Sequence, residues 1–567
     1  MKNFLFIVVL VSGILTSLAQ GEANNWFFGN GAGLVFNNLT GTVTASAAAA
    51  GTINTAEGCS SISDVNGNLL FYTDGRNVWD RNHQIMPNGN YNNGTGLLGD
   101  PSSTSSALIV PRPGNLYQFY IFTVDEPHHN NAWAYPNQGP ANASGNSIGS
   151  YSEGQGFTVP GADDGFNNGL NYSLVDLTLN AGNGDLDGNE KNVHLITYDP
   201  NDSEDPKFKC SEKITAVEHA DGQSYWLITQ FKDSFYAFRI DASGVNTTPV
   251  ISVTSPLIPT NGYRRNAIGY LKSSPDGSKI VAAHNQNGNI LGQTEFNSGS
   301  AWLYDFDDST GVVSNPLELS AGISFYGVEF SQDSKVVYLS GGNAVRQYDL
   351  QAASISTSEI IVQNSSGFLG ALQLGPDGKI YVCNSSNSQT LDVILSPNTL
   401  GTGCNYQVSG QALSAGTFAS LGLPPFIQSF LVANIQYDND CLGQTTQFSI
   451  SSSETILSIS WDFGDGQISS ATNPSNIYAA AGNYTVSVTI TTPTETKSFS
   501  TELTIYETPV ANNPGVLNIC DTDNDGQAAV DLNTLVSPSV LGSQSAADFE
   551  VLYFSSQADA DSGNSPI

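Results

Sequence analysis

The chain is a succession of short apolar runs separated by turns rich in Gly, Asn, Asp and Ser. One phrase occurs three times, at residues 274–283, 331–340 and 375–383. Each copy is a polar turn followed by a short apolar strand, and a small apolar segment precedes it. Strand-like runs bounded by such turns are typical of antiparallel sheets. The pattern therefore predicts an all-β domain built from repeated units.

The spacing of the copies predicts how these units are arranged. A strand unit that recurs at roughly 50 residues is typical of the blades of a β-propeller. The strand-like runs between residues 20 and 430 correspond to about seven blades of this kind. We assign the first four blades to residues 26–86, 106–124, 172–198 and 214–240, and the copies of the phrase begin the others. A propeller hosts many functions, so this fold does not identify one.

A different pattern begins after residue 430. Residues 482–490 alternate apolar and small polar side chains, which is typical of a strand with one buried face. Residues 461–466 read Trp-Asp-Phe-Gly-Asp-Gly. With Tyr478 and the Gly-Asn-Tyr-Thr-Val run at 482–486, this segment closely resembles the polycystic kidney disease (PKD) domain, an immunoglobulin-like β-sandwich. The resemblance implies a PKD domain over residues 431–508, after a propeller over residues 20–430.

Within this motif the residues have structural interpretations. We expect Trp461 to lie in the core of the sandwich. Asp462 and Asp465 are expected to cap a tight turn by accepting hydrogen bonds from backbone N–H groups.

Charge restricts the possible partners. The chain has 18 basic and 52 acidic residues, a formal net charge of -34, and only 12% charged residues. Such a surface repels a phosphate backbone, so nucleic acid is not an expected partner. It attracts divalent cations and basic surfaces, although simple solubility outside the cell explains the charge equally well.

The N-terminus has the features of a secretion signal. Lys2 gives a positive start, an apolar run follows, and small residues precede Gln20, so residues 1–19 are predicted to be a signal peptide. No later run of about 18 apolar residues occurs, so no membrane-spanning segment is predicted. We therefore expect an extracellular or cell-surface protein. Its six cysteines include no C-x-x-C, and Cys404 and Cys441 could form a staple across the domain junction.

The segment after the PKD domain contains the candidate metal site. Asp521, Asp523 and Asp525 with Gly526 match the first half of a calcium loop, in which alternating oxygen ligands surround a hard cation. Asp531 is one residue short of the position that closes such a loop, so the segment is more similar to the calcium loops of extracellular adhesins. A solvated acidic turn is the competing interpretation. Residues 509–567 are interpreted as the start of a further adhesin-like segment, in a protein expected to continue.

No catalytic constellation is evident. The G-x-S-x-G match at residues 145–149 lies in a Gly/Asn/Ser-rich stretch and not at a strand-to-helix elbow. Paired carboxylates for glycoside hydrolysis cannot be identified from spacing, because the fold sets their separation. Trp79, Trp226 and Trp302 are interpreted as core residues, whereas Trp133 lies in the same stretch and could be at the surface.

The order of signal, propeller and PKD domain resembles the surface proteins exported by the type IX secretion system of gliding bacteria. These carry a type B (gliding-motility-associated) C-terminal sorting domain, which is absent from this sequence. The phrases that carry the resemblance are residues 56–64, 67–75, 121–125, 270–279, 326–331, 370–379 and 421–430.

These observations favour a secreted or cell-surface binding and adhesion protein that is not an enzyme. The propeller would present a glycan or protein ligand, and the PKD domain would serve as a spacer or contact module. The alternative is a secreted carbohydrate-active enzyme, which acidic residues around a deep propeller mouth would favour. A purely structural stalk is a third interpretation.

Overall fold

The computed structural model forms two compact units. The first comprises residues 1–433 with 451–456 and 492–495, and the second comprises residues 434–450, 457–491 and 496–567. The structure describes residues 21–37, 42–47, 53–64, 67–126, 168–202, 205–259, 266–286, 299–427, 434–451, 456–491, 496–515, 518–520, 525, 529–546 and 551–555. The predicted signal peptide and most of the Gly/Asn/Ser-rich stretch with Trp133 lie outside these residues.

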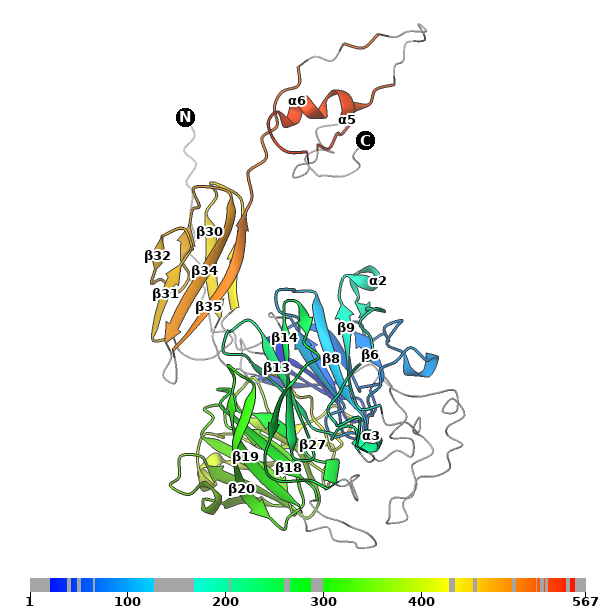
Figure 1. Cartoon of the computed structure of the whole chain (residues 1–567), viewed down its shortest axis with the longest axis vertical. Helices are drawn as coiled ribbons and strands as arrows, with labels where there is room; N and C mark the ends of the chain where they lie inside the picture. The colour runs from blue at the N-terminus through cyan, green and yellow to red at the C-terminus, as the bar shows by residue number, and fades with distance from the viewer. Residues whose placement is uncertain are drawn as a thin grey trace. The chain divides into compact units, whose positions relative to one another are not determined.

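The described part of the first unit contains seven antiparallel sheets, which run from blue to yellow-green in Figure 1. The first two are β1(Asn25–Phe28)–β2(Ala32–Asn37)–β3(Thr42–Ala47) and β4(Ser60–Ser63)–β5(Leu69–Thr73)–β6(Val78–Asp80). The third is β7(Ala107–Pro111)–β8(Gln118–Val124)–β9(Leu170–Asp176)–β10(Asp185–Leu186), with β11(Val193–Leu195) also on β9. The fourth is β12(Ile214–Glu218)–β13(Tyr225–Phe231)–β14(Ser234–Asp241)–β15(Gly244–Val245), with β16(Val250–Val253) also on β14.

The remaining three sheets have four strands each in sequence order. They are β17(Leu271–Ser273)–β18(Lys279–His284)–β19(Ser300–Asp307)–β20(Val312–Ala321), β21(Phe325–Phe330)–β22(Val336–Gly341)–β23(Ala344–Asp349)–β24(Ile360–Asn364) and β25(Leu369–Leu374)–β26(Ile380–Asn384)–β27(Thr390–Ile394)–β28(Tyr406–Ala412). The described helices are short: η1(Gly21–Ala23), η2(Tyr91–Asn93), α2(Leu179–Gly182), α3(Asp205–Phe208), η4(Ile355–Thr357), η5(Gly401–Cys404), α5(Leu532–Leu535) and α6(Ser537–Leu541).

The predicted number of blades is confirmed, but two of the predicted assignments are wrong. Residues 26–86 form two sheets, because β1–β3 do not pair with β4–β6. Residues 106–124 and 172–198 belong to one sheet, because β8 pairs with β9 along its whole length, with Gln118 opposite Asp176 and Val124 opposite Leu170. One predicted blade is thus two sheets and two predicted blades are one sheet, so the total stays at seven.

The first strand of each sheet lies innermost. Strands β4, β17, β21 and β25 are buried along nearly their whole length, whereas the last strands β20, β24 and β28 are largely exposed. Successive first strands are neighbours from β1 through β4, β7, β12, β17 and β21 to β25. The ring of Tyr381 in the last sheet meets Trp26 and Phe36 of the first sheet edge-on, at 5.4 and 5.5 Å. These contacts close the seven sheets into a propeller.

The repeated phrase forms a hairpin turn in each of the last three blades, and the turn in the last blade is one residue shorter. Ser274 donates its hydroxyl to Asp276 at 2.6 Å, and Ser331 does the same to Asp333 at 2.7 Å. In the third copy Gly375 replaces the serine, and its N–H still bonds the Lys379 carbonyl at 2.8 Å. The short Ser–Asp bond and the turn chemistry explain why the phrase recurs.

Buried polar contacts join the innermost strands of these three blades. Lys272 on β17 donates to Glu329 on β21 at 3.1 Å and to Gln373 on β25. Glu329 also accepts the Leu374 N–H at 3.0 Å, and all three side chains are buried. Each of the three residues lies two positions before its copy of the turn. The sequence repeat therefore places them at equivalent positions on three neighbouring innermost strands.

A segment that we call the clasp, residues 417–423, completes the ring. Phe418 exchanges two backbone hydrogen bonds with Asn30 of the first blade, at 2.8 and 3.2 Å. Leu421 donates to Ala56 at 2.9 Å and accepts from Ala371 of the last blade at 2.7 Å. A Cβ added to Gly422 would lie only 1.7 Å from the Glu57 carbonyl oxygen, so the clasp needs glycine there. The clasp therefore links the first, second and last blades.

The second unit contains a β-sandwich. One sheet is β29(Asn434–Asp438)–β30(Thr446–Ser451)–β33(Ser475–Asn476), and the other is β32(Ile468–Ser469)–β31(Ser458–Asp462)–β34(Gly482–Thr491)–β35(Thr496–Ile505). Trp461 is fully buried, as expected. Asp462 accepts the Gly464 N–H and Asp465 the Gln467 N–H, both at 2.9 Å, which confirms that they cap the turn.

Other predictions about single residues have mixed outcomes. Trp79 and Trp226 are buried, and Trp302 is partly buried against the same core, in agreement with a packing role. All six cysteines are free thiols. Cys404, one half of the suggested staple, is buried in the propeller beside the Tyr338 hydroxyl.

We expect Lys272→Met to lower the free energy of unfolding of the propeller by about 3–5 kcal/mol, because it leaves the buried Glu329 carboxylate uncompensated. The matched control is Lys335→Met, which removes an exposed ion pair with Asp333 at 3.7 Å and should cost less than about 1 kcal/mol. Urea denaturation of the whole chain measures the loss in free energy of unfolding for each variant. Hydrogen exchange of the backbone amides in the innermost strands shows whether the loss arises in the propeller. Equal effects would contradict this account of the buried contacts.

Gly422→Ala should destabilise the ring by about 1–3 kcal/mol, because the new methyl group overlaps the Glu57 carbonyl. Gly188→Ala is the control, since nothing lies within 4 Å of a Cβ there. Calorimetric unfolding temperatures of the two variants test the clasp. An unchanged temperature for Gly422→Ala would mean that the clasp does not hold the ring closed.

Candidate functional site

Side chains from several blades converge where the innermost strands begin. Glu57, Thr104 and Glu212 each come just before the first strand of a sheet, and Tyr326 lies at the start of β21. The second strands end at the same place because they run antiparallel to the first, which adds Glu126 after β8 and His284 at the end of β18. We call this end of the propeller the mouth.

Thr104 links two carboxyl groups at the mouth. Its hydroxyl donates to Glu212 Oε2 at 2.7 Å and lies 3.4 Å from Glu57 Oε2. Its N–H also donates to Glu212 Oε2, at 2.9 Å. A hydroxyl carries one proton, so the shorter contact to Glu212 takes it. Glu57 Oε2 instead accepts the Tyr326 hydroxyl proton at 2.7 Å.

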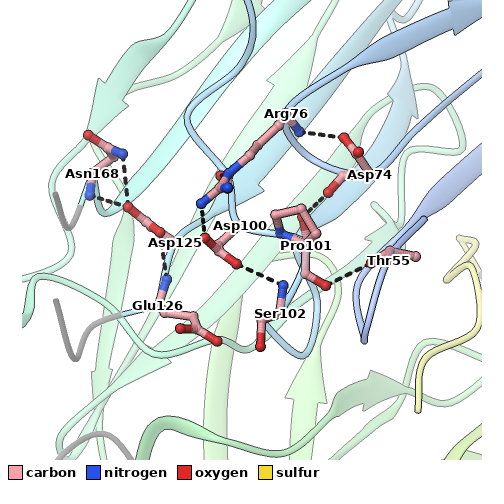
Figure 2. A network of polar contacts seen from close by, with 11 residues as sticks. Thr55, Asp74, Arg76, Asp100, Pro101, Ser102, Asp125, Glu126 and Asn168 are labelled. Carbon is pink, nitrogen blue, oxygen red and sulfur yellow. Dashed lines mark hydrogen bonds and ion pairs between the residues drawn. The ribbon is translucent and has the colours of Figure 1, made fainter. Parts of the chain in front are cut away.

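A network of buried polar groups holds this arrangement from the neighbouring blades (Figure 2). Arg76 pairs with Asp100, and Asp100 accepts the Ser102 N–H at 2.8 Å, which fixes the turn before Thr104. The Pro101 carbonyl accepts the Thr55 hydroxyl at 2.7 Å, close to Glu57 in the chain.

The same network orients the residues around Glu126. Asp125 accepts the Asn168 backbone and side-chain N–H groups at 2.7 and 2.8 Å. It also accepts the Glu126 N–H at 2.8 Å, as Figure 2 shows. One Asp125 carboxylate oxygen therefore bonds the Glu126 backbone and the other bonds Asn168, which fixes the backbone at Glu126.

One amine and one imidazole accompany the carboxyl groups. Lys213 Nζ donates to two backbone carbonyls, those of Ala267 at 2.5 Å and Ile268 at 3.0 Å. His284 is 1% exposed, and neither of its ring nitrogens has a hydrogen-bond partner among the described residues. Burial lowers the pKa of His284 well below its usual range, and the nearby Lys213 charge lowers it further. The imidazole is therefore neutral at pH 7.

Burial shifts the pKa values of the ionisable groups at the mouth toward their neutral forms. Burial raises the pKa of Glu57 well above its usual range and the neighbouring Glu212 raises it further, against the hydrogen bond from Tyr326. Burial and then Glu126 raise the pKa of Glu212 to about 7, although its bonds to Thr104 act the other way. Burial lowers the pKa of Lys213 to about 7, despite the opposing effect of Glu212.

Accessibility distinguishes the two bridged carboxyl groups. Glu212 is 2% exposed, whereas Glu57 is partly exposed. Phe368, which is 37% exposed, packs edge-on against Tyr326 with ring centroids 5.4 Å apart. Glu57 is therefore the more exposed of the two residues, and an aromatic ring lies beside its partner Tyr326.

The metal site predicted from sequence lies elsewhere and is only partly described. Asp521 and Asp523 fall outside the described residues, and Asp525 is exposed. Asp531 caps α5 by accepting the Thr534 N–H at 3.2 Å and the Thr534 hydroxyl at 2.6 Å. In the described part of the chain, no three His, Cys, Asp or Glu side chains are arranged to hold a metal ion. Calcium binding at residues 521–531 stays a prediction.

Sequence reasoning did not identify the mouth. Glu57 lies in a quoted phrase, residues 56–64, but Thr104 is 47 residues away and Tyr326 is 269 residues away. Each of these residues lies near the start of the first strand of a blade. Correct blade boundaries would therefore have placed these residues at equivalent positions in an alignment of the blades.

Comparisons with known proteins identify the C-terminal parts. Residues 432–505 match the PKD domain, and residues 516–567 match the Flavobacterium inter-domain disulphide bond domain. A search of curated proteins finds no significant match. Among the described residues, no helix is long and apolar enough to cross a membrane.

Solved structures resemble single parts of the chain. The PKD1 domain of Vibrio anguillarum Epp is 33% identical, over 14% of this chain and 94% of its own, with a TM-score of 0.13. The β-propeller domain of Myceliophteria thermophila Cps50 (Swd1) is 12% identical over 66% and 96% of the two chains, with a TM-score of 0.35. A putative 6-phosphogluconolactonase from Bacteroides uniformis is 11% identical over 80% and 96%, with a TM-score of 0.30. The seven closed sheets and the family match at residues 432–505 show that the chain combines a β-propeller with a PKD domain. The two family matches indicate an extracellular protein.

We expect the free energy of unfolding to depend on pH because Glu212 binds a proton more tightly in the folded protein than in the unfolded chain. The unfolded chain loses this proton near the ordinary value of 4.5, whereas the folded protein keeps it until about pH 7. The unfolded state therefore binds fewer protons between these values, and stability falls as pH rises through this window. Glu212→Gln should flatten this fall in a series of unfolding temperatures from pH 4 to 8, whereas the exposed control Glu318→Gln should not. Identical slopes in the wild type and Glu212→Gln would contradict the assignment.

Proposed function

We propose that this chain is a secreted or cell-surface binding and adhesion protein, not an enzyme, and that its propeller presents the ligand site at the mouth. The observation that carries the proposal is the combination of a partly exposed Glu57, fixed by the Tyr326 hydroxyl, with an exposed Phe368 beside it. A fixed polar group next to an aromatic surface is how binding sites for polar ligands are built.

The PKD domain has a supporting role in this proposal. A sandwich of about 74 residues at 432–505 serves as a spacer or as a second contact module for protein or glycan. Its turn is fixed by hydrogen bonds from the Gly464 and Gln467 N–H groups to Asp462 and Asp465. We further propose that the chain carries an N-terminal signal peptide and is exported by the type IX secretion system. These two points rest on the sequence of residues 1–19 and on the resemblance to its surface proteins.

A carbohydrate-active enzyme is the second candidate, and one observation favours it. Glu57 and Glu212 approach the same Thr104 hydroxyl, and the pKa of each carboxyl group is raised, as that of a general acid must be. Against this, Glu212 is buried, and its Oε2 already accepts two hydrogen bonds from Thr104. A buried carboxyl held in this way does not reach a substrate, so binding is the preferred function.

The deciding experiment screens the purified whole chain on glycan arrays and on protein-coated surfaces, with calcium and with chelator, alongside assays for released oligosaccharides. We expect saturable binding without product release, and a loss of about tenfold or more in affinity for Glu57→Gln, which removes a hydrogen-bonding carboxylate. Glu318→Gln, an exposed change of the same charge, is the matched control.

Released oligosaccharides that depend on Glu57 would replace the binding proposal with the enzyme. A calcium requirement that Asp523→Asn abolishes would support the metal site at residues 521–531, and binding unchanged by chelator would remove calcium from the proposal.

A further inference from the structure

Three connecting segments of the last blade lie at the mouth. Residues 365–368 lead into β25, residues 385–389 join β26 to β27, and residues 413–420 follow β28. Because neighbouring strands of this sheet are antiparallel, all three segments lie at the end of the blade where β25 begins. Phe368 in the first segment meets the Tyr326 ring, so the mouth extends onto the last blade.

These segments combine two exposed aromatic rings with an uncharged surface. Phe368 and Phe418 are each 37% exposed. None of the three segments contains Asp, Glu, Lys, Arg or His, although the chain as a whole has a net charge of -34. Apart from the two rings they consist of Ser, Asn, Gln, Thr, Gly, Ala and one Leu. Single exposed apolar residues are common on protein surfaces, but here two rings lie on adjoining loops without a charge between them.

Backbone hydrogen bonds hold the two rings on either side of one loop. The Ser385 N–H donates to the Phe368 carbonyl at 2.9 Å, and the Ala419 N–H donates to the Ser388 carbonyl at 2.7 Å. Three residues span at most about 11 Å, so one extended ligand can reach both rings. The rings are positioned before a ligand arrives, which reduces the ordering cost of binding.

Polar side chains lie between the rings. Ser385 and Gln389 are exposed and Ser388 is half-buried. The side chains of these three residues make no hydrogen bond to another residue that the structure describes. Hydroxyl and amide groups both donate and accept hydrogen bonds. We call these three residues, together with Phe368 and Phe418, the platform.

The composition of the platform selects among ligand classes. A charged ligand would find no opposite charge on these segments. Protein interfaces depend mainly on Trp, Tyr and Arg anchors, and the three segments contain none of them. A sugar ring instead presents C–H groups on its face, which pack against an aromatic ring, and hydroxyl groups at its edge, which both donate and accept. An uncharged saccharide therefore complements the platform best.

We propose that the platform binds an uncharged glycan, with Phe368 and Phe418 each packing against the face of a sugar ring and the three polar side chains bonding its hydroxyl groups. This inference rests on the proposed binding function and specifies its ligand class. It also extends the ligand site from Glu57 and Tyr326 to the outer loops of the last blade, as far as Phe418.

The test titrates the whole chain by calorimetry with uncharged hexasaccharides from cellulose, laminarin, xylan, mannan and chitin, and with anionic oligogalacturonate. We expect saturable binding of at least one uncharged probe and none of oligogalacturonate. Phe418→Leu should weaken this binding about tenfold, because leucine keeps the apolar volume but lacks a flat ring, whereas Phe418→Tyr should retain it. Circular dichroism confirms that each variant is folded.

A matched control removes an exposed ring elsewhere. Tyr117 is 59% exposed in the turn between β7 and β8, at the opposite end of the propeller from the mouth. Tyr117→Ala should leave glycan binding unchanged. A loss equal to that of Phe418→Leu would show that the effect does not come from the platform and would overturn the inference.

Two further readouts test the chemistry of the contact. Gln389→Ala should lower the affinity about threefold to tenfold, the effect of one lost hydrogen bond, whereas Gln407→Ala on the outermost strand of the same blade should not. The affinity for an uncharged glycan should change by less than about twofold between about 0.05 and 0.5 M salt, because no ion pair is screened. A steep salt dependence would contradict an uncharged contact.

The outcomes separate this inference from the proposed function. If glycan binding depends on Glu57 but is unchanged in Phe368→Leu and Phe418→Leu, the binding function stands and the platform is wrong. Binding of protein-coated surfaces or anionic glycans alone leads to the same conclusion. No binding to any glycan or protein surface contradicts the proposed function itself.

Discussion

Ring closure is the constraint on which both the fold and the mouth depend. The first and last sheets, β1–β3 and β25–β28, share no strand, so hydrogen bonds within one sheet do not seal the ring. The seal consists of the clasp and of the aromatic contacts of Tyr381 with Trp26 and Phe36. The clasp also packs Gly422 against the Glu57 carbonyl. The clasp thus helps to hold the propeller shut and packs against the backbone of Glu57, whose carboxyl group we propose as the ligand contact.

The sequence was a good guide where structure is local. The repeated phrase encodes a turn and an apolar strand that are complete within about ten residues, and all three copies fold as a turn followed by a strand. The same holds for the Trp-Asp-Phe-Gly-Asp-Gly motif, in which Asp462 and Asp465 bond N–H groups two residues away.

The early blades were misassigned because pairing there depends on distant partners. β3 is a Thr/Ala segment with little apolar signal, so the first sheet looked like part of the second. β8 and β9 pair in register although 45 residues separate Val124 from Leu170, and no local pattern reports a pairing at that separation. The mouth could not be predicted for the same reason, since its residues are brought together only by the order of blades around the ring.

The two ends of the propeller axis differ in how completely their buried polar groups are paired, and this contrast supports the proposal that the mouth binds a ligand. Toward the hairpin turns, Glu329 accepts hydrogen bonds from Lys272 and from the N–H groups of Phe330 and Leu374, so its charge and its acceptors are satisfied within the protein. At the mouth, Lys213 bonds backbone carbonyl groups, and the two ring nitrogens of His284 have no hydrogen-bond partner among the residues that the structure describes. The same propeller thus satisfies a buried carboxylate at one end and leaves a buried imidazole without such a partner at the other. Unsatisfied buried polar groups cost stability, and they persist where a ligand completes them.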